Sequence, residues 1–588
     1  MVETKIDFER AMRDYLVALY RVRVLNPKGH VCRCLYHREG GRKVLPLFGG
    51  FLASSAAYLA TTRFDGNEFY QNDEVFRLAL DAGDRLLLDH AAITSDTKPN
   101  HFQIYPLAKL YALLGGTVDK VRRDRWRETM ERNLKAVDAL IDRTGENLGK
   151  PGPWAGTGPN HYFGWFAVGY EQAQLLGESR IASKIEKAML RHLAVQSPAG
   201  YFPEYKGPAT GYQHVSLGGL AEYHRLNPLP QTKKAIENGL SYVLGAMYPD
   251  FRGIETFDER NRLGHDPRFG HALLWTPAGR NVFARTLALA RKDVQRKPGC
   301  CKPFVDAVPF TMAELYAVGA AFRCYEHAVA TRRIGVAKEL PLDRDAFAWK
   351  LEDKGLVRKQ GPWFYALSAY VHDAPQGNPY HLDRTQALSV YHECAGLIIG
   401  GGNDKRAYHA ATVHVREGGD CHYFPAMATR LLAGASARVL SGKGKCDHVE
   451  FDFGSVIAQL EVRAESPTRF RIGLGATSTQ TKPQVWLVLQ LPVRAPLKLD
   501  NDGVPLVLKK AQEGQAEEEH ELGRSLGSSE GWRMSLPRGS SLVWPHIPWN
   551  PYRPPSYLDF PEMAVALVRV PLHMSGMRAE VTLSVAGV

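Results

Sequence analysis

Over the first 330 positions, apolar residues recur at the spacing of amphipathic helices, in segments separated by Gly, Pro and Asn. Short connections between the segments favour antiparallel helical hairpins. A mixed stretch follows at 331–384, and after it the apolar residues alternate with polar ones. The predicted helices cover residues 7–25, 45–62, 68–92, 103–115, 118–143, 162–176, 181–195, 214–226, 231–247, 270–291 and 308–330.

The alternating runs predict β-strands that begin at Val449, Val456, Phe470, Val485, Val504, Met563 and Val581. Many short strands with Gly and Pro between them favour an antiparallel sandwich. We therefore expect a multidomain α+β protein, with a catalytic α/α toroid, an incomplete barrel of helical hairpins, over residues 1–375 and an antiparallel β-sandwich over residues 376–588. The run from Glu517 to His520 is interpreted as a solvated loop without functional weight.

Two of the predicted helical hairpins resemble each other. The segment 106–115 is similar to 168–177, and an Asn-His-aromatic triplet precedes each, at Asn100 and at Asn160, 60 positions apart (160 minus 100). A helix-pair repeat of about 50 to 60 residues is typical of a solenoid or, when closed, of an α/α toroid. Closure would place equivalent loops on one rim, so both triplets would face one cleft.

The composition is that of a globular protein, with 44% hydrophobic and 23% charged residues among 588. The length allows more than one core, and the composition excludes a disordered, collagenous or coiled-coil chain. A net charge of +12 is a mild basic excess that attracts polyanions. Lys and Arg are spread along the chain without a recognised nucleic-acid-binding motif, so an acidic glycan is favoured over nucleic acid.

The cysteines and the N-terminus bear on the compartment. Eight cysteines without a repeated CxxC pattern indicate reduced thiols. The first ten residues contain no apolar signal core, and no stretch is long enough to span a membrane. We therefore expect a cytoplasmic protein without a membrane partner, or a periplasmic or secreted one if a leader was removed. The oligomeric state stays open.

The most specific chemical signal joins Asn160 and His161 to Tyr212, which follows 52 positions later (212 minus 160). An amide, an imidazole and a phenol can withdraw a proton from a carbon next to a carboxylate and return one to a leaving oxygen, without metal or cofactor. These residues therefore predict β-elimination on a uronic-acid glycan. No cofactor is required.

The predicted toroid and sandwich resemble the heparinase II/III-like, alginate and chondroitin/hyaluronate lyases. In several of those families a helix begins with an Asn-His motif, and a later loop carries a catalytic Tyr after a Glu/Gly/aromatic stretch. Asn160, Glu204, Gly207 and Tyr212 match that pattern. The resemblance covers nearly the whole chain as architecture and only these few positions as motif. It implies that Asn160 and His161 neutralise the substrate carboxylate, while Tyr212 acts as base, acid or both.

Other residues complete this hypothesis. A basic Tyr needs cations nearby; Lys206 stands six positions before Tyr212 (212 minus 206), and Arg residues from other loops are further candidates. Some of these families add an imidazole or phenol from the sandwich. His392, His409, His414 and His422 are the candidates here; spacing does not decide among them, and His392 is taken as the catalytic one.

The candidate substrate-binding residues lie near the expected rim. An Asn at a helix start is otherwise an N-cap, and Asn100-His101 is a rival to Asn160-His161. A basic cluster would suit a sulfate or carboxylate, and its structural alternative is a salt-bridged loop. The full set is Asn100, His101, Trp165, Glu204, Tyr205, Lys206, Arg262, His265, Arg268 and His271.

Several alternatives stay open. A structural metal ion in the sandwich is an expectation without a matching zinc motif, although His409 with His414, Cys421-His422, and Cys446 with His448 offer ligand types. A glycoside hydrolase on the same toroid would instead use paired carboxylates among Glu204, Asp258, Glu259 and Asp266. A non-catalytic glycan-binding protein is the third class. Alginate and glycosaminoglycans are candidate substrates, and the sequence does not identify the uronate, its sulfation, or endo or exo action.

Overall fold

The fold is described from a computed structural model, which divides the chain into two compact units. The first comprises Met1–Pro203, Gln213–Leu244 and Pro267–Glu339, and the second comprises Glu204–Tyr212, Gly245–Asp266 and Leu340–Val588. The structure describes residues 6–26, 28, 30–31, 35–39, 41–45, 49–93, 99–100, 105–150, 158, 160–205, 207–260, 270–296, 312–370, 380–405, 407–416, 436–441, 446–479, 484–493, 496–509, 511, 515–549, 564–572 and 577–586.

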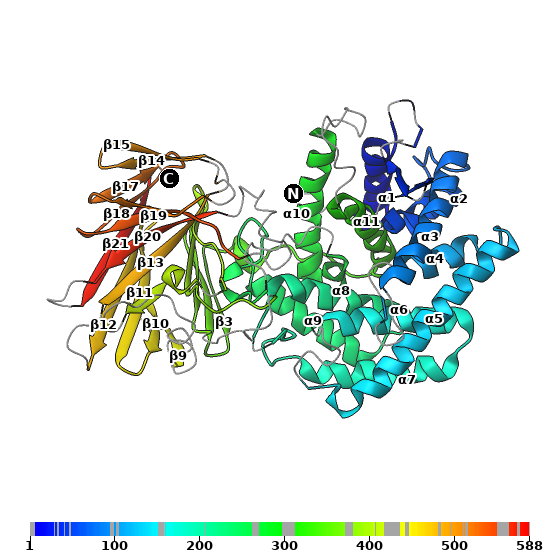
Figure 1. The fold of residues 1–588 in the computed structure, drawn as a ribbon, viewed down its shortest axis with the longest axis horizontal. Coiled ribbons are helices and arrows are strands. Elements are labelled where there is room, and N and C mark those ends of the chain that lie inside the picture. Colours follow the sequence, from blue (N-terminus) through cyan, green and yellow to red (C-terminus); the bar gives the residue numbers. More distant parts are fainter. Residues whose placement is uncertain are drawn as a thin grey trace. The chain divides into compact units, whose positions relative to one another are not determined.

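Helices dominate the first unit (Figure 1). Their bounds are α1 Phe8–Leu19, α2 Ala53–Thr61, α3 Asp73–Ile93, α4 Tyr105–Leu114, α5 Lys120–Thr144, α6 Asn160–Leu176, α7 Ser179–His192, α8 Thr210–Leu226, α9 Pro230–Gly245, α10 Pro277–Arg296 and α11 Met312–Ala330. A short hairpin of β1 His37–Glu39 and β2 Arg42–Val44 accompanies them. No helix among the described residues is long and apolar enough to cross a membrane.

Local sequence explains where the helices lie. α1 begins after Asp7, whose carboxylate accepts a hydrogen bond from the Arg10 N–H, and Asp119 does the same for α5. α5 ends at Thr144, and the Gly145 that follows has a φ of 50°, which suits a glycine. Along α7, residues such as Ile181 and Ile185 are buried while the opposite face is charged, as an amphipathic helix requires.

Alternate helices of the first unit form a closed ring. α2 packs on α4, and Lys109 of α4 lies 2.5 Å from Glu171 of α6. The ring continues from α6 to α8, from α8 to α11, and from α11 back to α2. These contacts join Tyr170 to Tyr223, Glu222 to His327, and Tyr325 to Tyr58. The α/α toroid predicted from the helix-pair repeat is therefore confirmed.

Three antiparallel sheets make up the second unit (Figure 1). One sheet has the order β3-β4-β5-β6-β7, another β16-β19-β20-β13-β8, and the largest β15-β14-β17-β18-β21-β12-β11-β10-β9. The bounds are β3 Ala346–Leu351, β4 Gly355–Gln360, β5 Trp363–Ser368, β6 Leu388–His392, β7 Gly396–Ile399, β8 Val413–Arg416, β9 Ser436–Ser441, β10 Asp447–Asp452, β11 Val456–Ser466, β12 Arg469–Ser478, β13 Gln484–Pro492, β14 Leu497–Asn501, β15 Val504–Leu508, β16 Glu518–Glu521, β17 Ser525–Ser528, β18 Trp532–Ser535, β19 Ser541–His546, β20 Val565–Pro571 and β21 Arg578–Val585.

The three sheets share one hydrophobic core. It includes Tyr365 of β5, Leu460 of β11 and Leu487 of β13, all 0% exposed. On β11 buried and less buried positions alternate, as expected for a strand with one face on a core. The antiparallel sandwich predicted after the helices is thus confirmed, and all seven predicted strands are present. Strands begin earlier than residue 376, because β3 to β5 occupy the stretch that had no clear period, and the second unit resumes at Leu340.

Candidate active site

Tyr212 lies in the second unit, beside two buried charges. The guanidinium carbon of Arg260 is 4.0 Å from the centroid of the Tyr212 ring. Arg260 Nη1 donates to Glu204 Oε2 at 2.7 Å, and both side chains are at least nine-tenths buried. A buried guanidinium bound to a carboxylate has few alternative positions, so Glu204 fixes the cation against the phenol. Tyr212 itself is half-buried.

Asp258 connects the start of α8 to this pair. Its Oδ2 accepts a hydrogen bond from the Gly211 N–H at 2.8 Å, and its Oδ1 accepts one from the Arg260 N–H at 2.7 Å. A carboxylate at the first turn of a helix satisfies a free N–H and favours the helix dipole. Asp258 therefore holds the residue before Tyr212 and the backbone of Arg260 at once.

A second arginine supports the same loop. Arg384 donates to the carbonyls of Phe257 and Pro208 at 2.5 and 3.1 Å and lies 3.4 Å from Glu259. Glu259 also accepts from the Tyr205 N–H at 2.7 Å. Residues 204–205 and 207–212 are thus tied to residues 257–260 by several buried polar contacts, which makes the position of Tyr212 well defined.

From the sequence we expect nearby cations to lower the pKa of Tyr212, but the structure gives a raised pKa. Burial raises the pKa of Tyr212 to about 12; Glu204 and Asp258 add to the rise, and Arg260 opposes it. The cation at the ring is therefore Arg260, while Lys206, the residue predicted for that role, lies outside the described residues. Tyr212 is a neutral phenol near neutral pH.

The Asn-His motif is part of the first unit. Asn160 is the first residue of α6 and is 1% exposed, and the half-buried His161 ring lies 5.6 Å from the Trp165 ring. Trp165 is also 1% exposed, so the structure corrects its predicted role: it packs in the core and cannot stack on a sugar. Asn100 is buried as well, and its N–H donates to Asn133 Oδ1.

Two predicted histidines are structural instead. His392 Nε2 lies 3.1 Å from the Pro467 carbonyl, its Nδ1 accepts from the Cys394 N–H, and the side chain is buried against Trp363. Both ring nitrogens are bound to backbone, so the prediction that His392 is catalytic is wrong. His271 is buried with its Nε2 3.0 Å from the Gly218 carbonyl, and burial lowers its pKa well below the usual range, so it is not a sulfate-binding cation.

The remaining predicted residues lie beside Arg260 and Glu259, outside the described residues, or on β8. Glu204 and Tyr205 lie beside Arg260 and Glu259 as described. His101, Lys206, Arg262, His265, Arg268, Asp266, Cys421 and His422 lie outside the described residues. His414 is buried against Trp486 on β8 and β13.

Three carboxylates proposed for the hydrolase alternative are already bound. Glu204 pairs with Arg260, Asp258 with two backbone N–H groups, and Glu259 with Arg384 and the Tyr205 N–H. All three are at most 1% exposed. A general acid or base must reach its substrate, and this arrangement gives these side chains an anchoring role.

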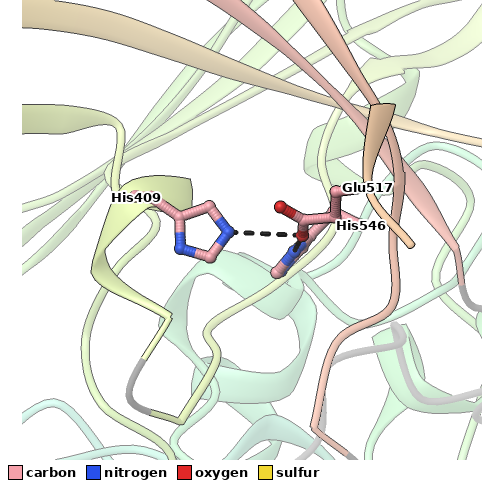
Figure 2. A group of neighbouring side chains, drawn as sticks. All are labelled: His409, Glu517 and His546. Carbon is pink, nitrogen blue, oxygen red and sulfur yellow. Dashed lines mark hydrogen bonds and ion pairs between the residues drawn. The ribbon is translucent and has the colours of Figure 1, made fainter. Parts of the chain in front are cut away.

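A separate cluster in the second unit joins His409, Glu517 and His546 (Figure 2). Glu517 Oε1 lies 3.3 Å from His409 Nε2 and 2.7 Å from His546 Nδ1. Burial opposes the charge of Glu517, but hydrogen bonds with both imidazoles outweigh it and lower the pKa to about 2. The sequence predicts a solvated loop from Glu517 to His520; Glu517 does precede β16, but Glu518, Glu519 and His520 belong to that strand.

Sequence reasoning missed Arg384, Asp404 and His546, and it expected a cation beside Tyr212 without naming Arg260. The signal that finds them is three-dimensional. Asn403 Nδ2 donates to the Asp258 carbonyl at 2.8 Å, and Asp404 Oδ2 lies 2.8 Å from His546 Nε2. A path of contacts thus runs from the start of α8 to the histidine cluster.

No family model and no curated protein sequence matches the chain. Solved structures similar to it include a chondroitinase AC lyase studied in oligosaccharide complexes, at 12% identity over 98% of this chain and 82% of that one, with a TM-score of 0.47. Heparan sulfate lyase HepC from Pedobacter heparinus matches at 11% identity over 98% and 82%, with a TM-score of 0.42. An unsaturated glucuronyl hydrolase specific for heparin matches at 12% identity over 56% and 99%, with a TM-score of 0.35. The chain is thus similar in fold to two polysaccharide lyases and to an unsaturated glucuronyl hydrolase.

Proposed function

We propose that the chain is a polysaccharide lyase that cleaves a uronate-containing glycan by β-elimination, with Tyr212 as the proton-transferring residue. The observation that carries this proposal is the contact between Arg260 and Tyr212, which lies near the start of α8. The guanidinium carbon of Arg260 is 4.0 Å from the centroid of the Tyr212 ring. A phenol beside a guanidinium can exist as the neutral acid or as a stabilised phenolate. Both forms are useful for proton transfer at a sugar.

In this reaction the C5–H bond breaks, a C4=C5 double bond forms, and the C4–O4 bond breaks with a proton delivered to O4. The neutral phenol is the form that donates this proton, and a pKa of about 12 keeps Tyr212 in that form. When Tyr212 instead accepts the C5 proton, Arg260 stabilises the required phenolate. Charge that develops on the uronate carboxylate needs preorganised donors, and the resemblance implies Asn160 and His161 for this role. Asn160 is 1% exposed, the same burial that excludes Trp165, so the half-buried His161 is the donor kept in this proposal.

The rival hydrolase reaction needs two accessible carboxylates. Glu204, Asp258 and Glu259 are buried and bound to arginine or backbone N–H groups. This supports elimination over hydrolysis at this site. The substrate class that fits the basic excess of the chain is an acidic glycan.

The test is ultraviolet absorbance with a panel of acidic glycans: alginate, glucuronan, heparan, chondroitin, hyaluronan and ulvan. Elimination creates a C4=C5 bond conjugated to the carboxylate, whereas hydrolysis creates only a new reducing end. We expect a rise in absorbance with the wild type and none with Tyr212→Phe. Tyr391→Phe, which removes a phenol of β6 packed against Tyr248, is the matched control and should retain activity. Reducing ends without absorbance would replace the lyase by a hydrolase.

A further inference from the structure

The geometry points to a zinc-binding site formed by His409, Glu517 and His546, outside the Tyr212 site and independent of the proposed lyase activity. Their ligand atoms all lie within 4.8 Å of one another. Figure 2 shows the Glu517 carboxylate between the two imidazoles. Two imidazole nitrogens and one carboxylate oxygen are a ligand set that suits Zn²⁺, with a fourth position for water or another group.

The fold builds this cluster from three elements. β16 pairs with β19 so that Glu518 opposes Trp544, which places Glu517 beside His546 at the end of β19. His409 belongs to the 3₁₀ turn Tyr408–Ala410. Ala410 is 0% exposed and packs against Val543 in the same sheet. The ligands are therefore held by a packed sheet, as a preorganised site requires.

The hydrogen-bond arrangement of His546 demands a positive charge. A neutral imidazole has one N–H and one lone pair. Yet His546 Nε2 lies 2.8 Å from Asp404 Oδ2 and Nδ1 lies 2.7 Å from Glu517 Oε1, so each nitrogen faces a carboxylate oxygen. These contacts require a second proton on His546 or a cation bound to both Nδ1 and Glu517, and a zinc ion there would separate these two ligand atoms to about 3.3 Å. Glu517 Oε1 also faces His409 Nε2, and one divalent ion satisfies both of these contacts at once.

Asp404 has the position of a supporting residue behind a metal ligand. Ligating histidines usually donate the other ring N–H to a carboxylate, which fixes the ring and strengthens its bond to the metal. Asp404 Oδ2 accepts from His546 Nε2, and its Oδ1 accepts from the Trp549 N–H at 2.9 Å. His546 is 4% exposed, so its ring has little freedom to turn away.

The site also connects to the Tyr212 loop. Asp404 follows Asn403, which donates to the Asp258 carbonyl, and Asp258 in turn binds the Gly211 N–H. A bound ion would thus stabilise the residue next to Tyr212 through a chain of buried contacts. This consequence for catalysis rests on the proposed function, whereas metal binding does not.

The experiment measures Zn²⁺ binding to the untagged full chain by calorimetry after dialysis against a chelator. We expect one site that Glu517→Gln and His546→Ala each weaken by roughly 10–100-fold or more. His448→Ala, which removes a histidine of β10 in the nine-stranded sheet, is the control and should bind as the wild type. Co²⁺ should give visible d–d absorption in the wild type that the two variants lose.

Glu517→Gln is the decisive variant, because the Glu517 side chain is 40% exposed and its replacement leaves the core intact. Equal Zn²⁺ affinity in the wild type and Glu517→Gln would overturn the proposal. Absence of Zn²⁺ binding by the wild type would also overturn the proposal. A second proton on His546 would then account for its contacts with Asp404 and Glu517. Neither result depends on whether the chain cleaves a glycan.

Discussion

Arg260 lies with its guanidinium carbon 4.0 Å from the centroid of the Tyr212 ring, while Glu204 holds the same guanidinium at 2.7 Å. The carboxylate of Glu204 thus helps to hold the cation beside the phenol. Because both charges are buried, the contact exists before any substrate binds. This preorganisation is what a group that stabilises developing charge needs.

Arg260→Lys should lower the rate of elimination strongly while leaving the fold intact. Lys keeps the charge, but it cannot reproduce the planar guanidinium that bonds Glu204 and faces the ring. We expect kcat to fall by roughly 10²–10³-fold, the range for loss of one preorganised donor. Initial rates on the responsive glycan measure this, and circular dichroism checks the fold.

Arg358→Lys is the matched control for that change. Arg358 forms a similar ion pair, with Nη2 2.8 Å from Asp447, on β4 and β10 of the same unit. Arg358→Lys should leave kcat within about twofold of the wild type. The fall in kcat expected for Arg260→Lys would then come from the place of Arg260 beside Tyr212, and not from the weakening of any arginine ion pair. If both variants lose activity equally, Arg260 has only a structural role.

Stability should respond to Glu204 and Arg260 as a coupled pair. Removing one partner leaves a buried charge unpaired, so Glu204→Gln and Arg260→Met should each lower the free energy of unfolding by about 3–5 kcal/mol. The double variant should recover most of this loss, because no unpaired charge remains. Urea unfolding of all four proteins gives the coupling energy. Additive losses would show that the pair is not coupled.

Helical periodicity and strand alternation were sufficient to predict the toroid and most of the nine-stranded sheet. They were not sufficient for the sheet from β3 to β7. All six residues of β5 and all five of β6 are buried, so no polar face marks them as strands. Without that signal the predicted domain boundary was placed after residue 375, which left β3 to β5 in the helical domain. The compact units divide the chain at other positions.

Within the candidate site, the sequence nominated Tyr212 but not its partner. Arg260 is 48 positions away (260 minus 212), and it meets Tyr212 because Asp258 binds the Gly211 N–H. The histidine cluster depends on register in the same way. Glu517 meets His546 through the pairing of β16 with β19, which no local pattern reveals. His392 was chosen for its residue type, and both of its nitrogens bind backbone.

Alkaline pH should destabilise the protein partly through Tyr212. Its pKa rises from 10 in the unfolded chain to about 12 in the fold, so the folded state holds the proton more tightly. The corresponding stability is fully present below pH 10 and is lost as the pH rises through 12. Tyr212→Phe should reduce the slope of stability against pH in this window by at most about 1.4 kcal/mol per pH unit. Unfolding in urea between pH 9 and 11.5 measures it, and an unchanged slope would contradict the raised pKa.

Acid should destabilise the protein through buried histidines of the helical ring, with His224 as the clearest case. Burial lowers the pKa of His224 to about 4, and its Nδ1 lies 2.7 Å from Thr232 Oγ1. The unfolded chain therefore binds a proton that the fold excludes, and stability is lost as the pH falls from 6.5 to 4. His224→Gln should reduce that slope by at most about 1.4 kcal/mol per pH unit. An unchanged slope in His224→Gln would show that burial of His224 does not cause the loss of stability in acid.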